Sequence, residues 1–350
     1  MKRLPILCFL IWLLVLAVPA QGQEFRWLAF GDSITLGNYD FDELGGYPGR
    51  LNDLLNCSPG VCEVFNAGDS GEKTFQGVTR IDGVLDDDGP FDVMMLMEGT
   101  NDIFREYSVE TMVTNLAIMA DKAQIRGTET VHASIIWYHP DGTWGTSKDD
   151  EVEDLRDEME TLAAASDRYF VDIWDVLCPD SHPDVHGHGQ NQCFNRHYSE
   201  VPETDNRGHP VGSGYTMMAA AFYDGLNAAP IPGVSTPTSP AGVTTDDRPL
   251  FEWTRESPTD ATWYRFLVED DLGVRSDLWL KASIFCDPTT CAYQGFLPLE
   301  NGDYSWRIQG RNPAGSGSWS ADTDFSIQLD VIFQDGFESG DTGAWTSAEP

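Results

Sequence analysis

The stretch Phe30–Gly37, FGDSITLG, places a serine between an aspartate and a β-branched residue, directly behind an apolar segment. A serine hydroxyl becomes a useful nucleophile when a neighbouring base takes its proton. Serine is also common at the start of a helix, where its side-chain oxygen accepts a backbone N–H. Ser33 is therefore either a nucleophile or a helix cap, and the remaining residues must decide between these two roles.

His209 is the histidine best suited to act as that base. It lies in a loop ahead of a glycine-rich turn and of a helix expected over Gly212–Leu226. Asp205 stands four residues upstream, and a carboxylate at that spacing can accept the imidazole Nδ1–H and stabilise the cation that forms during catalysis. The alternative is that Asp205 caps a turn and His209 is a surface residue. His132, by contrast, begins an apolar segment and is expected to be a core or edge histidine.

Two further loops could supply hydrogen-bond donors to an oxyanion. The first, Asn66–Thr74 (NAGDSGEKT), contains Gly71, and the second, Glu98–Asp102 (EGTND), ends an apolar run and places the Asn101 amide at its rim. Glycine and asparagine are ordinary turn residues when each loop is taken alone. Combined with a serine and a histidine at strand ends, they indicate an acyl-transfer site.

With these loops the chain resembles the SGNH, or GDSL-type, esterase family. The four blocks occur in order as GDSIT (Gly31–Thr35), NAGDSG (Asn66–Gly71), GTND (Gly99–Asp102) and DNRGH (Asp205–His209). The resemblance spans the whole first part of the chain and implies an esterase that needs no metal or cofactor.

The resemblance also implies a role for each site residue. Ser33 would be the nucleophile and His209 the base, while Asp205 is expected as the acid from its position near His209 and not from the resemblance. The oxyanion hole would consist of the backbone N–H groups of Ser33 and Gly71 and the side-chain amide of Asn101. Asp32 and Asp102 would shape the loops without joining the triad.

The chain departs from the family pattern at one position. The family usually places its acid three residues before the histidine, where this chain has Asn206. Either the loop is one residue longer and Asp205 still reaches His209, or Ser33 and His209 act mainly as a pair.

Short apolar segments alternate with helical periodicity between Arg26 and Ala229. This alternation predicts a doubly wound, flavodoxin-like α/β domain with a parallel sheet over residues 24–229, and ligands are expected beyond the carboxyl ends of its strands. The expected strands are Arg26–Phe30, Glu63–Asn66, Phe91–Met97, Val131–Trp137 and Tyr169–Ile173.

Period-two alternation replaces the helical pattern in the last third of the chain. A proline-rich linker is expected over residues 230–242, and a small all-β sandwich over residues 243–329. This part resembles fibronectin type III-like modules in its FEW and YSWR strands and its RNPAGSGSWS turn.

Residues 330–350 form a tail rich in glycine and aspartate. We expect it to be disordered or a sorting signal, with a calcium site at Asp335, Glu338 and Asp341 as the alternative.

The amino-terminal residues indicate export. Residues 1–20 combine a positive start, an apolar run and a small-residue cleavage site, as a secretory signal peptide does, and no membrane-spanning segment is expected after cleavage. The six cysteines beyond it fall into sequence-local pairs, Cys57 with Cys62, Cys178 with Cys193 and Cys286 with Cys291, which favours disulfides over zinc. His182, His186 and His188, inside the second pair, could bind a metal or simply belong to a solvated loop.

The net charge of −36 excludes nucleic acid as a partner because such a surface repels polyanions. The sequence thus predicts a secreted serine esterase that acts on a small ester or an acetylated extracellular polysaccharide. A short-chain lipid or aryl esterase is the alternative. A third possibility is a non-catalytic exported binding protein on the same scaffold.

Overall fold

The computed structural model describes residues 24–40, 44–136, 147–177, 209–210, 212–255, 261–295 and 297–329. The first part of the chain forms a five-stranded sheet in which every neighbouring pair is parallel. Its strands are β1 (Phe25–Gly31), β2 (Cys62–Gly68), β3 (Val93–Met97), β4 (Glu129–Ala133) and β5 (Tyr169–Val171). The order β2-β1-β3-β4-β5 is that of flavodoxin-like doubly wound folds, so the expected fold class is confirmed.

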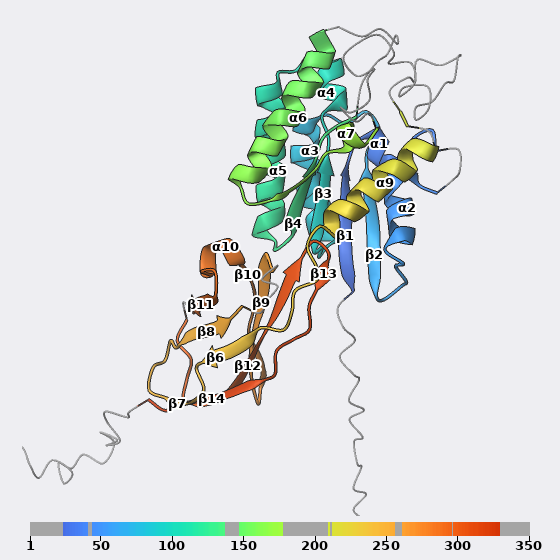
Figure 1. The fold of residues 1–350 in the computed structure, drawn as a ribbon. Helices are drawn as coiled ribbons and strands as arrows, with labels where there is room; N and C mark the ends of the chain where they lie inside the picture. Colours follow the sequence, from blue (N-terminus) through green and yellow to red (C-terminus); the bar gives the residue numbers. More distant parts are fainter. Residues whose placement is uncertain are drawn as a thin grey trace, which may run out of the picture.

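Helices cover both faces of this sheet (Figure 1). They are α1 (Ser33–Leu36), α2 (Gly46–Leu54), α3 (Thr74–Gly83) with a π-helical turn (Val84–Asp88), α4 (Thr100–Phe104), α5 (Val109–Ile125), α6 (Ser147–Ala165), α7 (Ile173–Leu177) and α9 (Gly212–Leu226). Successive strand residues point to opposite faces, so Trp27 and Ala29 pack against α2 and α9, while Leu28 and Phe30 pack in the core built from α3, α5 and α6. The fourth strand begins earlier and ends sooner than expected, at Ala133 instead of Trp137.

The last part of the chain forms two further sheets that face each other across a shared apolar core. The larger one contains β7 (Gly242–Thr244), β9 (Trp263–Asp270), β10 (Gly273–Lys281), β12 (Gly302–Asn312), β13 (Gly315–Ser316) and β14 (Thr323–Ile327), and the smaller one β6 (Thr236–Ser239), β8 (Leu250–Thr254) and β11 (Thr290–Gln294). A short helix, α10 (Ala282–Phe285), follows β10. The arrangement is sandwich-like, as the alternating pattern predicted. Strand β6 lies within the segment expected to be a linker and pairs with β8.

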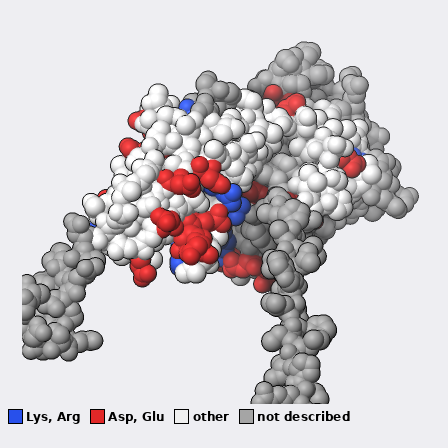
Figure 2. Space-filling model, turned by 90° about the horizontal axis from the view of Figure 1, so that it is seen from below, with Lys and Arg blue, Asp and Glu red and all other residues white. Residues whose placement is uncertain are grey.

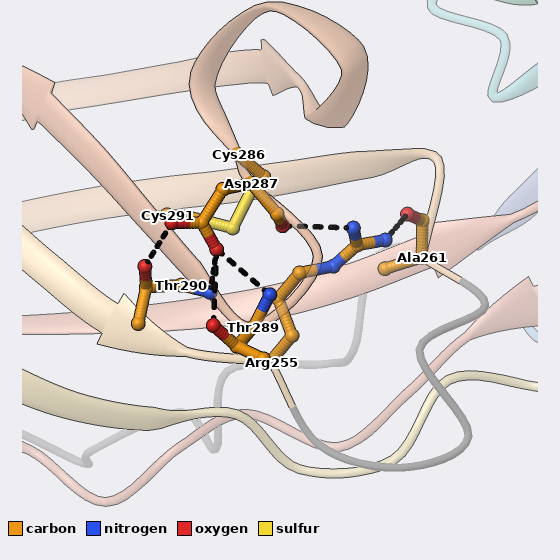
Figure 3. Close-up of a disulfide and its surroundings, with 7 residues drawn as sticks. All are labelled: Arg255, Ala261, Cys286, Asp287, Thr289, Thr290 and Cys291. Carbon is orange, nitrogen blue, oxygen red and sulfur yellow. Dashed lines mark hydrogen bonds between the residues drawn. A yellow bond between two sulfur atoms is a disulfide. The ribbon is translucent and has the colours of Figure 1, made fainter.

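Two disulfides join cysteines five residues apart, Cys57 with Cys62 and Cys286 with Cys291. The second closes the turn ahead of β11, where Asp287 accepts hydrogen bonds from the backbone and hydroxyl groups of Thr289 and Thr290 (Figure 3). These bonds lower the pKa of Asp287 to about 2. The disulfides expected at these two pairs are therefore present, and Cys178 and Cys193 lie outside the described residues.

The β-sheets dock against the amino-terminal ends of the parallel strands. Arg311 of β12 is fully buried and forms an ion pair of 2.8 Å with Asp92, the residue before β3. Thr262 donates a hydrogen bond of 2.7 Å to Glu129 at the start of β4, and the indole N–H of Trp27 donates one of 3.2 Å to the carbonyl of Pro313. The sandwich-like region thus lies at the opposite end of the parallel sheet from the residues that follow its strands.

Acidic side chains dominate the charged groups on the face seen from below in Figure 2, with few basic groups beside them. This view agrees with the excess of 57 acidic over 21 basic residues in the chain. Within the described residues, no helix is long and apolar enough to cross a bilayer.

Candidate active site

Ser33 is the first residue of α1, immediately beyond the carboxyl end of β1. The helix is capped by Asp32, whose Oδ1 accepts a hydrogen bond of 2.9 Å from the backbone N–H of Ile34. The capping role that the sequence left open for Ser33 is therefore filled by its neighbour. At the strand end, a Cβ on Gly31 would lie 2.1 Å from the carbonyl oxygen of Met97, so only glycine allows β1 and β3 to approach this closely.

His209 meets Ser33 across 176 residues of sequence. Its Nε2 lies 2.8 Å from Ser33 Oγ, a hydrogen-bond distance at which a proton can pass between the two atoms. His209 precedes α9 and packs its ring 4.9 Å from the ring of Tyr39, centroid to centroid. Tyr39, which follows the short helix that carries the serine, belongs to no motif that could have singled it out from sequence.

The two other predicted loops come from the strands on either side of β1. Gly71 follows β2 and adopts a positive φ of 79°, a conformation that favours glycine. Asn101 is the second residue of α4, behind β3, and its Nδ2 donates a hydrogen bond of 3.2 Å to Asp32 Oδ2. The second N–H of this amide remains for another acceptor, and the N–H of Ser33, at the start of a helix, has no intrahelical partner.

Asp102 joins the two loops that carry Gly71 and Asn101. Its carboxylate accepts hydrogen bonds from Thr74, 2.9 Å from the backbone N–H and 2.7 Å from the hydroxyl. Asn115 of α5 in turn donates to the Thr74 hydroxyl at 2.9 Å. The start of α3 is therefore fixed relative to α4, and with it the spacing of the two loops.

Several buried carboxylates lie beneath these loops. Burial raises the pKa of Asp32 to about 7, with the nearby charges of Glu72 and Asp102 adding to the effect. Glu98 is 1% exposed, and its pKa is raised well above the usual range, also mainly by burial. Glu72 binds Arg80 of α3 through two hydrogen bonds of 2.7 and 2.5 Å. Sequence reasoning missed this pair, because Glu72 lies ahead of α3 and no helical spacing links it to Arg80.

Not every residue named from the sequence can be placed. Asp205 and Asn206 lie outside the described residues, as do His182, His186, His188, Asp335, Glu338 and Asp341. His132 is fully buried in β4, and burial lowers its pKa to about 3, which suits a core histidine. Within the described part of the chain, no group of three or more potential metal-binding side chains occurs.

The comparisons with known proteins agree with this geometry at the level of family. The profile of the GDSL-like Lipase/Acylhydrolase family matches residues 29–216, which span Ser33 to His209. The comparison with curated proteins gave no match.

Three solved structures illustrate the likeness among known folds. A member of the lipolytic G-D-S-L family from Veillonella parvula is 20% identical, with 56% of this chain and 95% of that chain covered and a TM-score of 0.45. An acetylxylan esterase from Geobacillus stearothermophilus is 18% identical, covering 58% and 94%, with a TM-score of 0.45. An α/β hydrolase from the metagenome of Lake Arreo, Spain, is 18% identical, covering 57% and 94%, with a TM-score of 0.46.

Proposed function

Because the chain belongs to the GDSL-like lipase/acylhydrolase family, it is a carboxylic ester hydrolase, and we propose that its reaction proceeds through Ser33 and His209. The observation that carries this proposal is the 2.8 Å distance between Ser33 Oγ and His209 Nε2. The competing view of a non-catalytic binding protein gives no reason for a histidine to meet this serine at the strand ends.

The proposed reaction has two halves. His209 Nε2 takes the proton from Ser33 Oγ as the oxygen attacks the ester carbonyl carbon. The resulting oxyanion accepts hydrogen bonds from the N–H groups of Ser33 and Gly71 and from the amide of Asn101. The C–O bond to the alcohol then breaks, and His209 returns the proton to the leaving oxygen. Water, deprotonated by the same histidine, attacks the acyl-serine, and the acid is released as Ser33 regains its proton.

We propose acetyl esters of an extracellular neutral polysaccharide as the substrate. Export and the appended β-sheets support a polymer outside the cell, and the charge of −36 disfavours polyanionic esters. Aromatic rings near the oxyanion loops support a ring-bearing alcohol: Phe75 of α3 and Tyr107 are exposed, with their centroids 5.9 Å apart, and Phe104 at the end of α4 is exposed too. Rings of this kind would also accept an aryl ester, so a short-chain lipid or aryl esterase is the second candidate.

Export itself is part of the proposal. The signal-like residues 1–20 and two disulfides support a secreted or periplasmic protein, since disulfides persist in oxidising compartments. The expected result is a mature amino terminus close to residue 21 when the protein is recovered outside the cytoplasm and sequenced.

We further propose that the sandwich-like region is a fibronectin type III-like module, supported by its two facing sheets and shared core.

The decisive test compares Ser33→Ala with the unmodified protein on p-nitrophenyl acetate and on acetylated xylan. We expect Ser33→Ala to lower kcat by at least about a thousandfold on both, because the nucleophile is lost. Ser283→Ala, an exposed serine of α10, is the matched control and should keep full activity. Activity retained in a folded Ser33→Ala protein would contradict the assignment. Activity on p-nitrophenyl acetate but not on acetylated xylan would favour the second candidate, a short-chain lipid or aryl esterase.

A further inference from the structure

The five tryptophans that the structure describes in the sandwich-like region divide into two kinds. Trp253, Trp263 and Trp306 are buried. Trp279 of β10 and Trp319, between β13 and β14, are only half-buried and line a cleft of about 410 Å³. Packing in the core explains the buried tryptophans, whereas Trp279 and Trp319 each expose part of the indole ring to the cleft.

The cleft lies where the sandwich-like region meets the parallel sheet. One wall comes from the outer face of the larger β-sheet and carries Arg265, Gln309 and the two tryptophans, and the other wall carries Phe25 of β1 and Asp92. Flat aromatic rings thus stand beside a guanidinium, an amide and a carboxylate. A mainly apolar wall with a few well-placed polar groups is the usual composition of a small-molecule site.

Arginine side chains lie over the rings of both tryptophans. The Arg265 guanidinium carbon lies 5.9 Å from the centroid of Trp279 and 5.7 Å from that of Trp319. Arg311 stacks on Trp279 at 3.8 Å, and Arg307 lies 5.1 Å from Trp319. Such contacts fix ring orientation before any ligand arrives, which lowers the entropy lost on binding.

Each of these arginines already has a carboxylate partner. Arg265 binds Asp277 through two hydrogen bonds of 2.9 and 2.7 Å, Arg311 binds Asp92 at 2.8 Å, and Arg307 lies 3.3 Å from Glu269. Their charges are therefore compensated, and the cleft offers no surplus of positive charge to an anion. The net charge of −36 of the whole chain also disfavours an anionic ligand.

We propose that this cleft binds a neutral segment of a polysaccharide. A sugar ring presents an apolar C–H face, which suits the indole of Trp319, and an edge of hydroxyl groups, which suits the amide of Gln309 and the charged groups beside it. An anionic polymer would find no unpaired cation here, and an apolar ligand would make no use of the polar groups that line the wall.

This site is separate from the proposed catalytic serine. The cleft touches Phe25 at the amino-terminal end of β1, while Ser33 follows the carboxyl-terminal end of the same strand. Seven residues of strand span about 23 Å, so a bound polymer segment would be held at a distance from the reacting ester. The inference depends on the cleft alone and stands whether or not Ser33 is the nucleophile.

The test titrates the full mature chain with neutral oligosaccharides that carry no ester, namely xylohexaose, cellohexaose and mannohexaose, by calorimetry and tryptophan fluorescence. Polygalacturonate is the anionic comparison. We expect at least one neutral probe to bind and to change the fluorescence. Trp319→Ala should weaken that binding about tenfold or more, whereas Trp319→Phe, which keeps a flat ring, should weaken it less.

Leu272→Ala is the matched control, since Leu272 is an 80% exposed apolar residue in the turn between β9 and β10 and does not line the cleft. It should bind as the unmodified protein does, and Trp319→Ala should keep its turnover of p-nitrophenyl acetate. Absence of binding to all three neutral probes would overturn the proposal. So would binding that survives Trp319→Ala unchanged, or binding of polygalacturonate alone.

Discussion

Asp102 accepts both the backbone N–H and the hydroxyl of Thr74, at 2.9 and 2.7 Å, and so ties the loop after β2 to the loop after β3. Gly71 lies three residues before Thr74, and Asn101 directly precedes Asp102. The two donors that we assign to the oxyanion hole therefore keep their spacing through a residue that does not itself touch the ester. Asp102 is a positioning residue in this scheme.

Replacing Asp102 tests that role. Asp102→Ala leaves two buried donors without an acceptor, so we expect the free energy of unfolding to fall by about 1–3 kcal/mol. We also expect kcat to fall about tenfold or more with little change in KM, because misplaced oxyanion donors weaken transition-state binding most. Asp102→Asn keeps one acceptor oxygen and should recover part of both losses. Unchanged kcat in Asp102→Ala would show that the loop spacing does not depend on this carboxylate.

Substitutions at Asp205 and Asn206 distinguish the two residues of the DNRGH block that could support His209. If Asp205 supports His209, Asp205→Ala should lower kcat by about 10²–10⁴ while Asn206→Ala has a small effect, because only a carboxylate stabilises the imidazolium. The reverse ranking would assign the supporting role to Asn206. Small effects from both would mean that Ser33 and His209 act as a pair. Steady-state kinetics on p-nitrophenyl acetate checks all three outcomes.

The loops of Ser33, Gly71 and Asn101 were predictable from sequence because each one follows a strand end, and parallel strands bring their carboxyl ends to one edge. His209 precedes helix α9 instead, and it was named from the carboxylate beside it and from the resemblance to the family's fourth block. Which of Asp32 and Ser33 caps helix α1 could not be predicted, because both residue types are good caps and only the backbone geometry shows which one does so.

The contacts between the α/β domain and the sandwich-like region could not be predicted from the sequence either. Arg311 and Asp92 are 219 residues apart, and neither local period nor charge pattern links them. Strand β6 was not predicted because its segment, TPTS, contains Pro237 and was interpreted as part of the linker. Proline is tolerated in a strand at the edge of a sheet, and β6 lies at such an edge.

The buried ion pair between Arg311 and Asp92 predicts that the two parts unfold together. Arg311→Ala would leave Asp92 without its partner in a buried setting, and we expect a loss of about 3–5 kcal/mol in the free energy of unfolding. Tryptophan fluorescence and residual esterase activity should report the same shifted transition. Arg248→Ala removes an exposed arginine whose nearest carboxylate contact is 3.9 Å and should change stability by less than about 0.5 kcal/mol. Separate transitions for the two signals would show that the parts unfold independently.

Glu129 makes the stability of the same interface depend on pH. Burial raises its pKa from 4.5 to about 7, and the hydrogen bond from Thr262 and the charges of Arg311 and Lys281 only partly oppose that shift. Between these two pKa values the unfolded chain has lost the proton while the folded chain keeps it. This group therefore favours unfolding increasingly as pH rises from 4.5 to 7, and its effect levels off above 7.

Glu129→Gln should remove that dependence because the amide mimics the protonated acid. We expect the free energy of unfolding of Glu129→Gln, relative to the unmodified protein, to rise by about 1–3 kcal/mol between pH 4.5 and 7.5, measured by urea titration at each pH. Glu110→Gln, at an exposed position on α5, controls for the loss of one negative charge and should show no such trend. A difference between Glu129→Gln and the unmodified protein that stays constant across this range would mean that Glu129 ionises in the folded protein as it does in the unfolded chain.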